Sequence, residues 1–336
     1  MKRETTESGV FAPIVLGPNQ PERFYRGGEE ITRFRGGGGG HQQQPEDWVA
    51  STTTLYGQKS AGLSVLPDGG RLVDAILRDP VDWLGPEHVQ RFGSDPMLLV
   101  KLLHAGERLP VHAHPDAEFA AARLGHRHGK AEAWYLLADA EIWLGLREGL
   151  SAERVRALTQ TPDPMSLLAM MHHRRLRAGD TVFVPPGTLH AIGAGSLLAE
   201  VQEPEDLSIL LEWEGFGELP AAHLGLGIDE VTAAFDLAAM TSQQIYALVA
   251  GPADARRLPV AADQFFRFER IVVKAAVRLE KGYSVLIVAS GSVELMNTRA
   301  EQLGLAAGST VVVPYGAGDL ELTGSGEVLV FRPPAP

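Results

Sequence analysis

The chain contains no cysteine among its 336 residues. Disulfide bonds and thiolate metal ligands are therefore excluded, and a reducing compartment is compatible with the sequence. The first residues lead into no apolar core of signal-peptide length, and no later stretch is long and apolar enough to span a bilayer. We expect a cytoplasmic protein with no membrane partner.

Positive charge is also scarce. Thirty lysines and arginines stand against 42 aspartates and glutamates, which gives a formal net charge of −12 at pH 7. This balance argues against a broad basic surface for nucleic acid, although one local basic pocket is enough for a small anionic substrate. We expect a small-molecule ligand and no nucleic-acid partner, and both a monomer and a homodimer remain open.

The sequence lacks long apolar runs. Its apolar runs are short and are separated by glycine and proline. Many short strands with such punctuation predict a mainly β fold of the barrel or jelly-roll kind. Helical patterns interrupt the strands twice, the first beginning at the plausible N-cap Ser151. The predicted strands of the first half occupy residues 97–103, 109–114, 131–137, 140–146, 181–184, 197–201 and 207–213.

An internal repeat organises the chain. Residues 179–187 match residues 308–316 position by position, which predicts two copies of one β-barrel unit. No histidine follows His223, so we expect the second copy to be free of metal. The expected parts are a mobile Gly-rich segment (1–50) joining the first barrel, a catalytic barrel (51–225) with a helical insertion at about 151–175, a helical linker (226–262) and a C-terminal barrel (263–336).

Four residues predict one metal site. His112 and His114 lie two apart on a predicted strand and therefore share one face. Glu132 on a neighbouring strand and His190 after a Pro-Gly turn can complete the set. A lone His-x-His pair is common on an exposed edge strand, but four positions agree here. Three imidazoles and a carboxylate suit a divalent ion with open positions for substrate oxygens; we expect zinc, with manganese, iron or nickel as alternatives.

Four charged residues are candidates for chemistry beside this site. Lys130 lies two residues before Glu132 and shares its strand face, whereas Lys101 interrupts an apolar run, where an ammonium is costly outside a polar cavity. Glu200 and Asp206 share one parity and could line the barrel beside the ligands. The alternatives are an outward-facing strand for Lys101 and a polar outer surface for the two carboxylates.

Several motifs resemble those of type I mannose-6-phosphate isomerases, a branch of the cupin superfamily, over nearly the whole chain. They are the Glu-Asp-Trp segment at 46–51, Lys101 with the His-Pro-Asp element at 114–116, Gly-Lys-Ala-Glu at 129–132 and Gly-Thr-Leu-His-Ala-Ile-Gly at 187–193. The resemblance implies two cupin barrels in tandem, the second from Phe265 without metal. It also implies a metal-dependent enzyme of carbohydrate metabolism that interconverts mannose 6-phosphate and fructose 6-phosphate.

Three positions depart from the family pattern. His112 stands where the family usually has glutamine, Pro110 where it has serine, and Leu210 where it has arginine. An imidazole in place of an amide should keep a metal site. Leucine cannot replace the bidentate contacts of a guanidinium to phosphate. An isomerase of an unphosphorylated or differently substituted sugar is therefore an alternative.

Aldose–ketose interconversion moves a proton between C1 and C2 through an enediolate, whose charge a divalent ion can stabilise. In this interpretation Glu200 or Asp206 is the base, and Lys130 and Lys101 stabilise anionic charge. Two other classes remain open. Three histidines and a glutamate also serve iron-dependent cupin dioxygenases, and a non-catalytic cupin would bind sugar without turnover.

Overall fold

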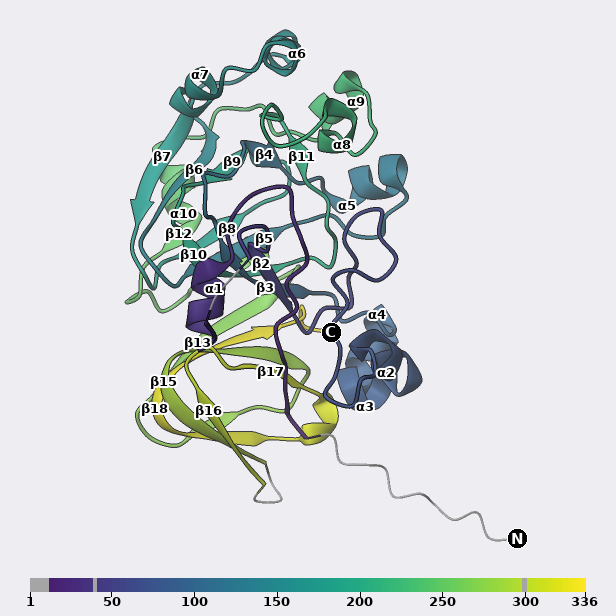
Figure 1. Cartoon of the computed structure of the whole chain (residues 1–336), viewed down its shortest axis with the longest axis vertical. Helices are drawn as coiled ribbons and strands as arrows, with labels where there is room; N and C mark the ends of the chain where they lie inside the picture. The colour runs from purple at the N-terminus through teal and green to yellow at the C-terminus, as the bar shows by residue number, and fades with distance from the viewer. Residues whose placement is uncertain (1–11, 39–40, 298–300) are drawn as a thin grey trace, which may run out of the picture.

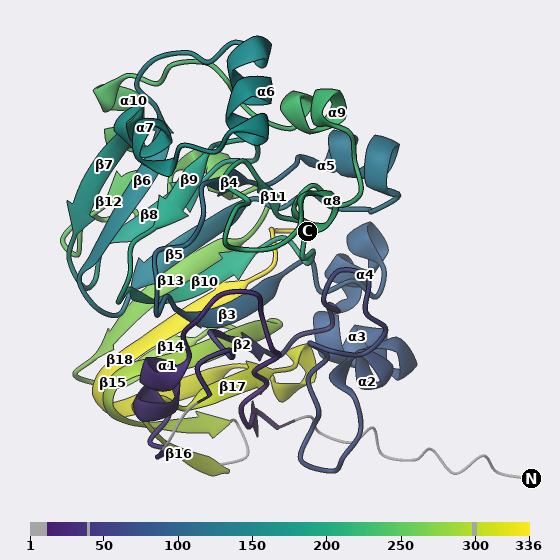
Figure 2. The same ribbon diagram turned by 45° about the horizontal axis from the view of Figure 1, so that its top comes forward.

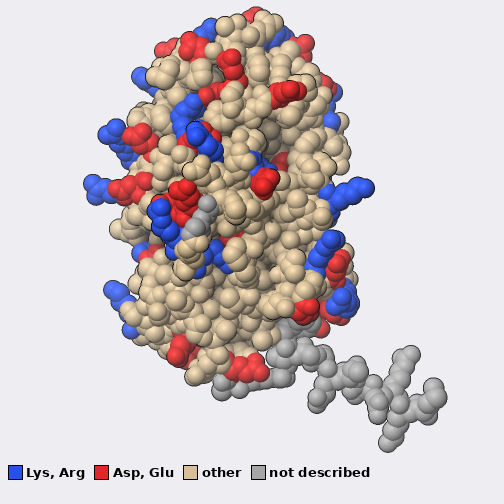
Figure 3. All heavy atoms as spheres, in the orientation of Figure 1, with Lys and Arg blue, Asp and Glu red and all other residues tan. Residues whose placement is uncertain are grey.

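A computed structural model describes residues 12–38, 41–297 and 301–336. The described chain forms three antiparallel sheets with short helices at their edges and ends (Figure 1). The predicted mainly β fold is confirmed. Closure of the sheets into two barrels stays a prediction. On the face drawn in Figure 3, basic and acidic side chains are interspersed.

The six-stranded sheet forms one wall of the site. Its strand order is β12-β8-β5-β10-β3-β2. All residues of β2, β3, β5 and β8 are buried, which explains why the apolar residues of β3, β5 and β8 do not alternate with exposed polar ones. In the order of the sheet, the strands are β12 (Val249–Ala250), β8 (Thr181–Val184), β5 (Glu132–Leu136), β10 (Leu197–Gln202), β3 (Leu99–His104) and β2 (Glu46–Val49).

The five-stranded sheet faces it. A shared core cluster contains Trp134 and Leu136 from the first sheet and Ile142, Leu144 and Ile192 from the second, so the two sheets pack against each other. At the edge, β7 alternates half-buried and exposed residues between its two buried ends, as expected for a strand with one solvated face. The strands, in order, are β11 (Ile209–Leu210), β4 (His112–Ala113), β9 (His190–Ile192), β6 (Ala140–Leu146) and β7 (Met171–Leu176).

The third sheet is C-terminal, except that β1 (Ile14–Val15) pairs with β17. Figure 2 shows this sheet lying alongside the six-stranded sheet. A second core joins the two, and Phe183 packs there against Phe266. The repeat noted in the sequence forms equivalent local structures, because β8 and β17 each follow a glycine of positive φ, Gly179 and Gly308. The C-terminal strands are β13 (Arg267–Val273), β14 (Val277–Leu279), β15 (Ser284–Asn297), β16 (Gln302–Ala306), β17 (Thr310–Val313) and β18 (Leu320–Arg332).

The helices are short. The insertion predicted at about 151–175 contains α6 (Ala152–Gln160), capped by Ser151, and α7 (Pro164–Ala169), but it ends earlier than predicted because β7 pairs with β6. The predicted 226–262 linker also contributes β12 to a sheet. The other helices are α1 (Glu29–Phe34), α2 (Leu72–Arg78), α3 (Pro80–Leu84), α4 (Pro86–Phe92), α5 (Ala117–Phe119), α8 (Leu219–Ala222), α9 (Ile228–Ala233) and α10 (Ser242–Ala247), with helical turns at Ala120–Leu124, Val260–Ala262 and Tyr315–Ala317.

The N-terminal segment differs most from the prediction. Residues 1–11 and 39–40 lie outside the described residues, but the rest of the segment is packed rather than loose. Ile31 and Trp48 are fully buried, and Ile14 pairs with Val312. The prediction of a mobile segment is wrong for this part, because its partners lie far away in the sequence and its own composition is polar. In the described part of the chain, no helix is long and apolar enough to cross a membrane.

Candidate metal centre

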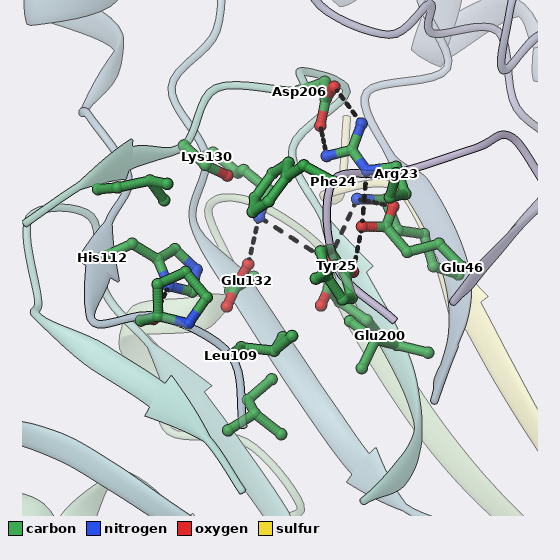
Figure 4. A pocket seen from close by; sticks show the side chains of 16 residues that line it. Arg23, Phe24, Tyr25, Glu46, Leu109, His112, Lys130, Glu132, Glu200 and Asp206 are labelled. Atoms are coloured by element: carbon green, nitrogen blue, oxygen red, sulfur yellow. Dashed lines mark hydrogen bonds and ion pairs between the residues drawn. The ribbon is translucent and has the colours of Figure 1, made fainter. Parts of the chain in front are cut away.

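The two facing sheets bring the four predicted ligands together. His112 on β4 is in register with His190 on β9, and His114 follows β4 directly. Glu132 is the first residue of β5 in the opposite sheet. Figure 4 shows His112 and Glu132 converging on one pocket. A turn, two strand pairs and the packing of two sheets thus position one cluster.

The three imidazoles present their Nε2 atoms to each other. Their ligand nitrogens all lie within 4.8 Å of one another. In each ring Nδ1 lies 2.8 Å from a backbone carbonyl, which can only accept a hydrogen bond, so Nδ1 carries the proton and Nε2 a lone pair. The carbonyls that hold His112, His114 and His190 belong to Pro110, Leu207 and Thr188, respectively.

This donor set fits a divalent cation. The Nε2 atom of His190 is buried without a hydrogen-bond partner, a costly arrangement for a polar atom. The Glu132 carboxylate lies 3.0 Å from Nε2 of His114 and 3.2 Å from Nε2 of His190. Three converging lone pairs with a carboxylate are a ligand set typical of zinc and similar metals. Within the described ranges, the three histidines form the single such group.

Burial sets the protonation states that a metal requires. It lowers the pKa of His112 well below its usual value, and together with the Lys130 ammonium it lowers the pKa of His114 to about 4. Burial raises the pKa of Glu132, but Lys130 and His114 outweigh it and hold that pKa well below its usual range. These histidines are thus neutral and the carboxylate ionised at neutral pH, the forms that bind metal.

Both predicted lysines lie buried in the pocket. Lys130 Nζ donates to Glu132 Oε2 at 2.6 Å and lies 2.9 Å from His114 Nε2. Lys101 Nζ lies 3.2 Å from Glu46 Oε2 and 3.7 Å from Glu200 Oε1. Cross-strand pairing explains the last contact, because Glu200 on β10 is directly opposite Lys101 on β3.

The two candidate bases differ in environment. Glu200 is buried, its Oε1 has no hydrogen-bond partner, and burial together with Glu132 raises its pKa to about 7 despite the nearby lysines. Asp206 lies beyond β10 and accepts two hydrogen bonds of 2.9 Å from Arg23. Burial raises the pKa of Asp206, but Arg23 and Lys101 lower it below its usual value. A carboxylate held in this way is a poor base, so the structure favours Glu200.

Sequence reasoning missed the contribution of the N-terminal segment. Arg23, Phe24 and Tyr25 all line the pocket (Figure 4). Arg23 Nε donates to Glu46 Oε1 at 3.1 Å, and the Tyr25 hydroxyl donates to the same oxygen. The Glu-Asp-Trp motif was the available signal for Glu46. Nothing in the local pattern around Arg23 indicated a site.

Curated relatives in sequence are mannose-6-phosphate isomerases, although no protein-family model matches the chain. The mannose-6-phosphate isomerase of Streptococcus mutans is 33% identical over 200 residues, which cover 55% of this chain and 60% of that protein. The probable mannose-6-phosphate isomerase GmuF of Bacillus subtilis is 30% identical over 198 residues, covering 58% and 59%. The match thus spans about three fifths of the length of these relatives.

Solved structures extend the similarity to nearly the whole chain. A putative mannosephosphate isomerase from Archaeoglobus fulgidus superposes with a TM-score of 0.78 at 18% identity, covering 97% of this chain and 99% of that one. The mannose 6-phosphate isomerase from Bacillus subtilis gives a TM-score of 0.72 at 19% identity, covering 96% and 100%. The chain is thus similar to mannose-6-phosphate isomerases in sequence over about three fifths of their length and in fold over nearly all of it, as its motifs indicated.

Proposed function

We propose that this chain is a metal-dependent aldose–ketose isomerase. The observation that carries the proposal is the convergence of three imidazole lone pairs and Glu132 on one pocket, beside the buried carboxyl group of Glu200. The names of the relatives supply the first sugar to test, mannose 6-phosphate, whose ketose isomer is fructose 6-phosphate.

His112, His114, His190 and Glu132 would hold the ion, and zinc is the ion we propose. When bound, it would supply Lewis-acid stabilisation for the negative charge that develops on the sugar oxygens. The second copy of the repeat contributes no histidine, so we place one ion in each chain.

Glu200 is the proposed proton-transfer group. In the aldose-to-ketose direction it would remove the proton from C2 and deliver a proton, which can exchange with solvent, to C1. The proton of the C2 hydroxyl would pass to the C1 oxygen, so that a carbonyl forms at C2 and a hydroxyl at C1. A pKa near 7 suits both steps, because an efficient base and an efficient acid have pKa values near the working pH. Lys101 and Lys130 lie 3.7 and 3.9 Å from Glu200 Oε1 and can stabilise the anionic charge of the enediolate.

An assay with purified protein tests the proposal. Metal content is measured first, and isomerisation is then followed by NMR in deuterated water with zinc or manganese under anaerobic conditions. We expect one ion per chain and deuterium incorporation into the product sugar. A requirement for dioxygen would support the dioxygenase instead, and sugar binding without turnover would support the non-catalytic cupin; either result would overturn the proposal.

A further inference from the structure

We propose that the pocket beside the histidine cluster takes an uncharged aldose, with a hydroxyl rather than a phosphate at the end remote from the metal ligands. This inference rests on the proposed isomerase function and narrows its substrate class. It follows from how the cations of the pocket are paired and from the apolar character of the other lining residues.

The Arg23 guanidinium in the pocket is already paired with carboxylates. Arg23 donates to both carboxylate oxygens of Asp206 at 2.9 Å and to Glu46 at 3.1 Å. The side chain of Arg23 is only 10% exposed, and those of its two partners are 5% and 4% exposed. A phosphate that recruited Arg23 would take it from carboxylates buried in the same pocket, and a buried charge without its partner is strongly unfavourable.

The two lysines of the pocket are also paired with carboxylates. Lys101 lies between Glu46 and Glu200, and Lys130 lies 2.6 Å from Glu132 and 3.9 Å from Glu200. Their side chains are 3% and 5% exposed. Neither ammonium is a spare cation at the surface of the pocket.

Counted over the described lining residues, three cations thus face four carboxylates. Arg108, which precedes the pocket residue Leu109 in the chain, is itself paired with Glu212 through two hydrogen bonds. A dianionic phosphate would add negative charge to this set without gaining an unpaired partner. A divalent ion at the histidines would offset the excess negative charge. It would lie, however, at the end of the pocket that must hold the reacting sugar oxygens.

The uncharged part of the lining is mostly apolar. Five of its side chains carry no hydrogen-bond donor, and Phe24, which is 48% exposed, also lines the pocket. The Ser208 hydroxyl in the same lining lies 3.4 Å from His114 Nδ1, at the end of the metal ligands. Such an apolar lining can pack against the C–H groups of a sugar, whereas it would leave phosphate oxygens desolvated and unpaired. The five are Leu103, Leu109, Pro110, Ile192 and Leu210.

Paired substrates test this inference in the zinc-loaded wild type. Turnover is compared for mannose, glucose and other free aldoses against their 6-phosphates, and calorimetry compares mannitol with mannitol phosphate, which have no carbonyl to isomerise. We expect at least a tenfold preference for the uncharged member in both measurements. A tenfold preference for the phosphates would overturn the inference and leave the isomerase intact. If no sugar is isomerised, the proposed function fails, while the calorimetric preference still decides the inference; binding of neither polyol would overturn it.

A substitution tests the pairing argument directly. Asp206→Asn keeps the side-chain shape, removes one carboxylate and releases the Arg23 guanidinium, so the affinity for mannitol phosphate relative to mannitol should rise about tenfold. Asp319→Asn, which removes the exposed partner of Arg278, is the matched control and should leave the ratio unchanged. Circular dichroism and zinc content verify that both variants fold. An unchanged ratio in folded Asp206→Asn would contradict the inference.

A second substitution adds a cation to the apolar lining. Leu210→Arg should raise the affinity for mannitol phosphate relative to mannitol when compared with Leu210→Met. If neither Asp206→Asn nor Leu210→Arg raises this ratio, the inference is overturned.

Discussion

At the scale of single residues, the site depends on titratable groups removed from water. His112 and His114 are neutral because burial disfavours their protonated forms, and Glu132 stays ionised chiefly because the Lys130 ammonium lies beside it. Without a metal ion, keeping these groups buried lowers the free energy of unfolding of the protein. Single substitutions among them should therefore change stability as well as activity.

The first prediction is that acid destabilises the metal-free protein already below about pH 6.5. An unfolded histidine takes a proton near pH 6.5, whereas His114 in the folded chain resists protonation until about pH 4. Its contribution is thus complete above pH 6.5 and is lost as the pH falls toward 4, at about 1 kcal/mol per pH unit. Urea unfolding between pH 4.5 and 8 measures the slope, which His114→Gln should reduce. A pH-independent free energy of unfolding would contradict this prediction.

The second prediction concerns Glu200, whose pKa is raised on folding, whereas that of His114 is lowered. Its pKa rises from 4.5 to about 7 on folding, so it destabilises the metal-free fold progressively as the pH increases through this interval. Glu200→Gln should raise the free energy of unfolding at pH 8 by about 1–3 kcal/mol. The same variant should lower kcat at least about a hundredfold if Glu200 transfers the proton. A folded variant with wild-type kcat would remove Glu200 from the mechanism.

At the scale of elements, the turn before β9 delivers a ligand. Gly187 has φ of +80°, its N–H donates to the carbonyl of His114 at 2.7 Å, and His190 follows three residues later. This turn therefore couples two of the proposed ligands through the backbone. Its geometry should matter for metal binding as well as for stability.

We expect Gly187→Ala to lower zinc affinity about tenfold, because a strained turn displaces the ligands. Gly195→Ala is the matched control, since Gly195 also has positive φ (+83°) but has open space around it and lies in another turn. Both variants should lose about 1 kcal/mol of stability. Zinc titration with a competing chelator distinguishes them, and equal zinc affinities would contradict the role of the turn.

The elements also show what the sequence could predict. Strands β3, β5, β6, β8 and β10 were predicted because each is an apolar run bounded by turn residues. Strand β7 was missed because His172, His173, Arg174 and Arg175 give it a polar composition, and β9 because it has only three residues. The ligands and lysines were found from spacing and motifs. Arg23 and Tyr25 were not, because their carboxylate partners in the pocket, Glu46 and Asp206, lie far from them along the chain.

At the scale of the whole molecule, the two copies of the repeat have different chemistry. The first copy carries the histidine cluster, and the C-terminal sheet packs against the outer side of the six-stranded sheet through a shared apolar core. Our proposal assigns catalysis to the first copy and structural support to the second.

Substitutions in the two copies should therefore differ in effect. Glu132→Gln changes a proposed ligand and should reduce kcat/KM at least about a hundredfold. Asp319→Ala removes an exposed ion pair with Arg278 and a hydrogen bond from the Lys281 backbone N–H, both far from the histidine cluster in the chain, and should change kcat/KM less than about twofold. Kinetics on both variants, with folding verified by circular dichroism, make the comparison. Comparable losses would contradict the division of roles.

The central claim is that one divalent ion, held by the histidine cluster, is required for isomerisation. The most direct measurement is to remove metal with a chelator, add zinc back in steps, and follow both bound zinc and aldose–ketose interconversion in the wild type and in His190→Ala. Exposed His173, changed to Ala, is the control. We predict that wild-type and His173→Ala activity is lost with the metal and returns in proportion to zinc, reaching its maximum at one ion per chain, while His190→Ala binds zinc at least about a hundredfold more weakly. Full activity in the metal-free protein, or unchanged zinc binding by His190→Ala, would contradict the claim.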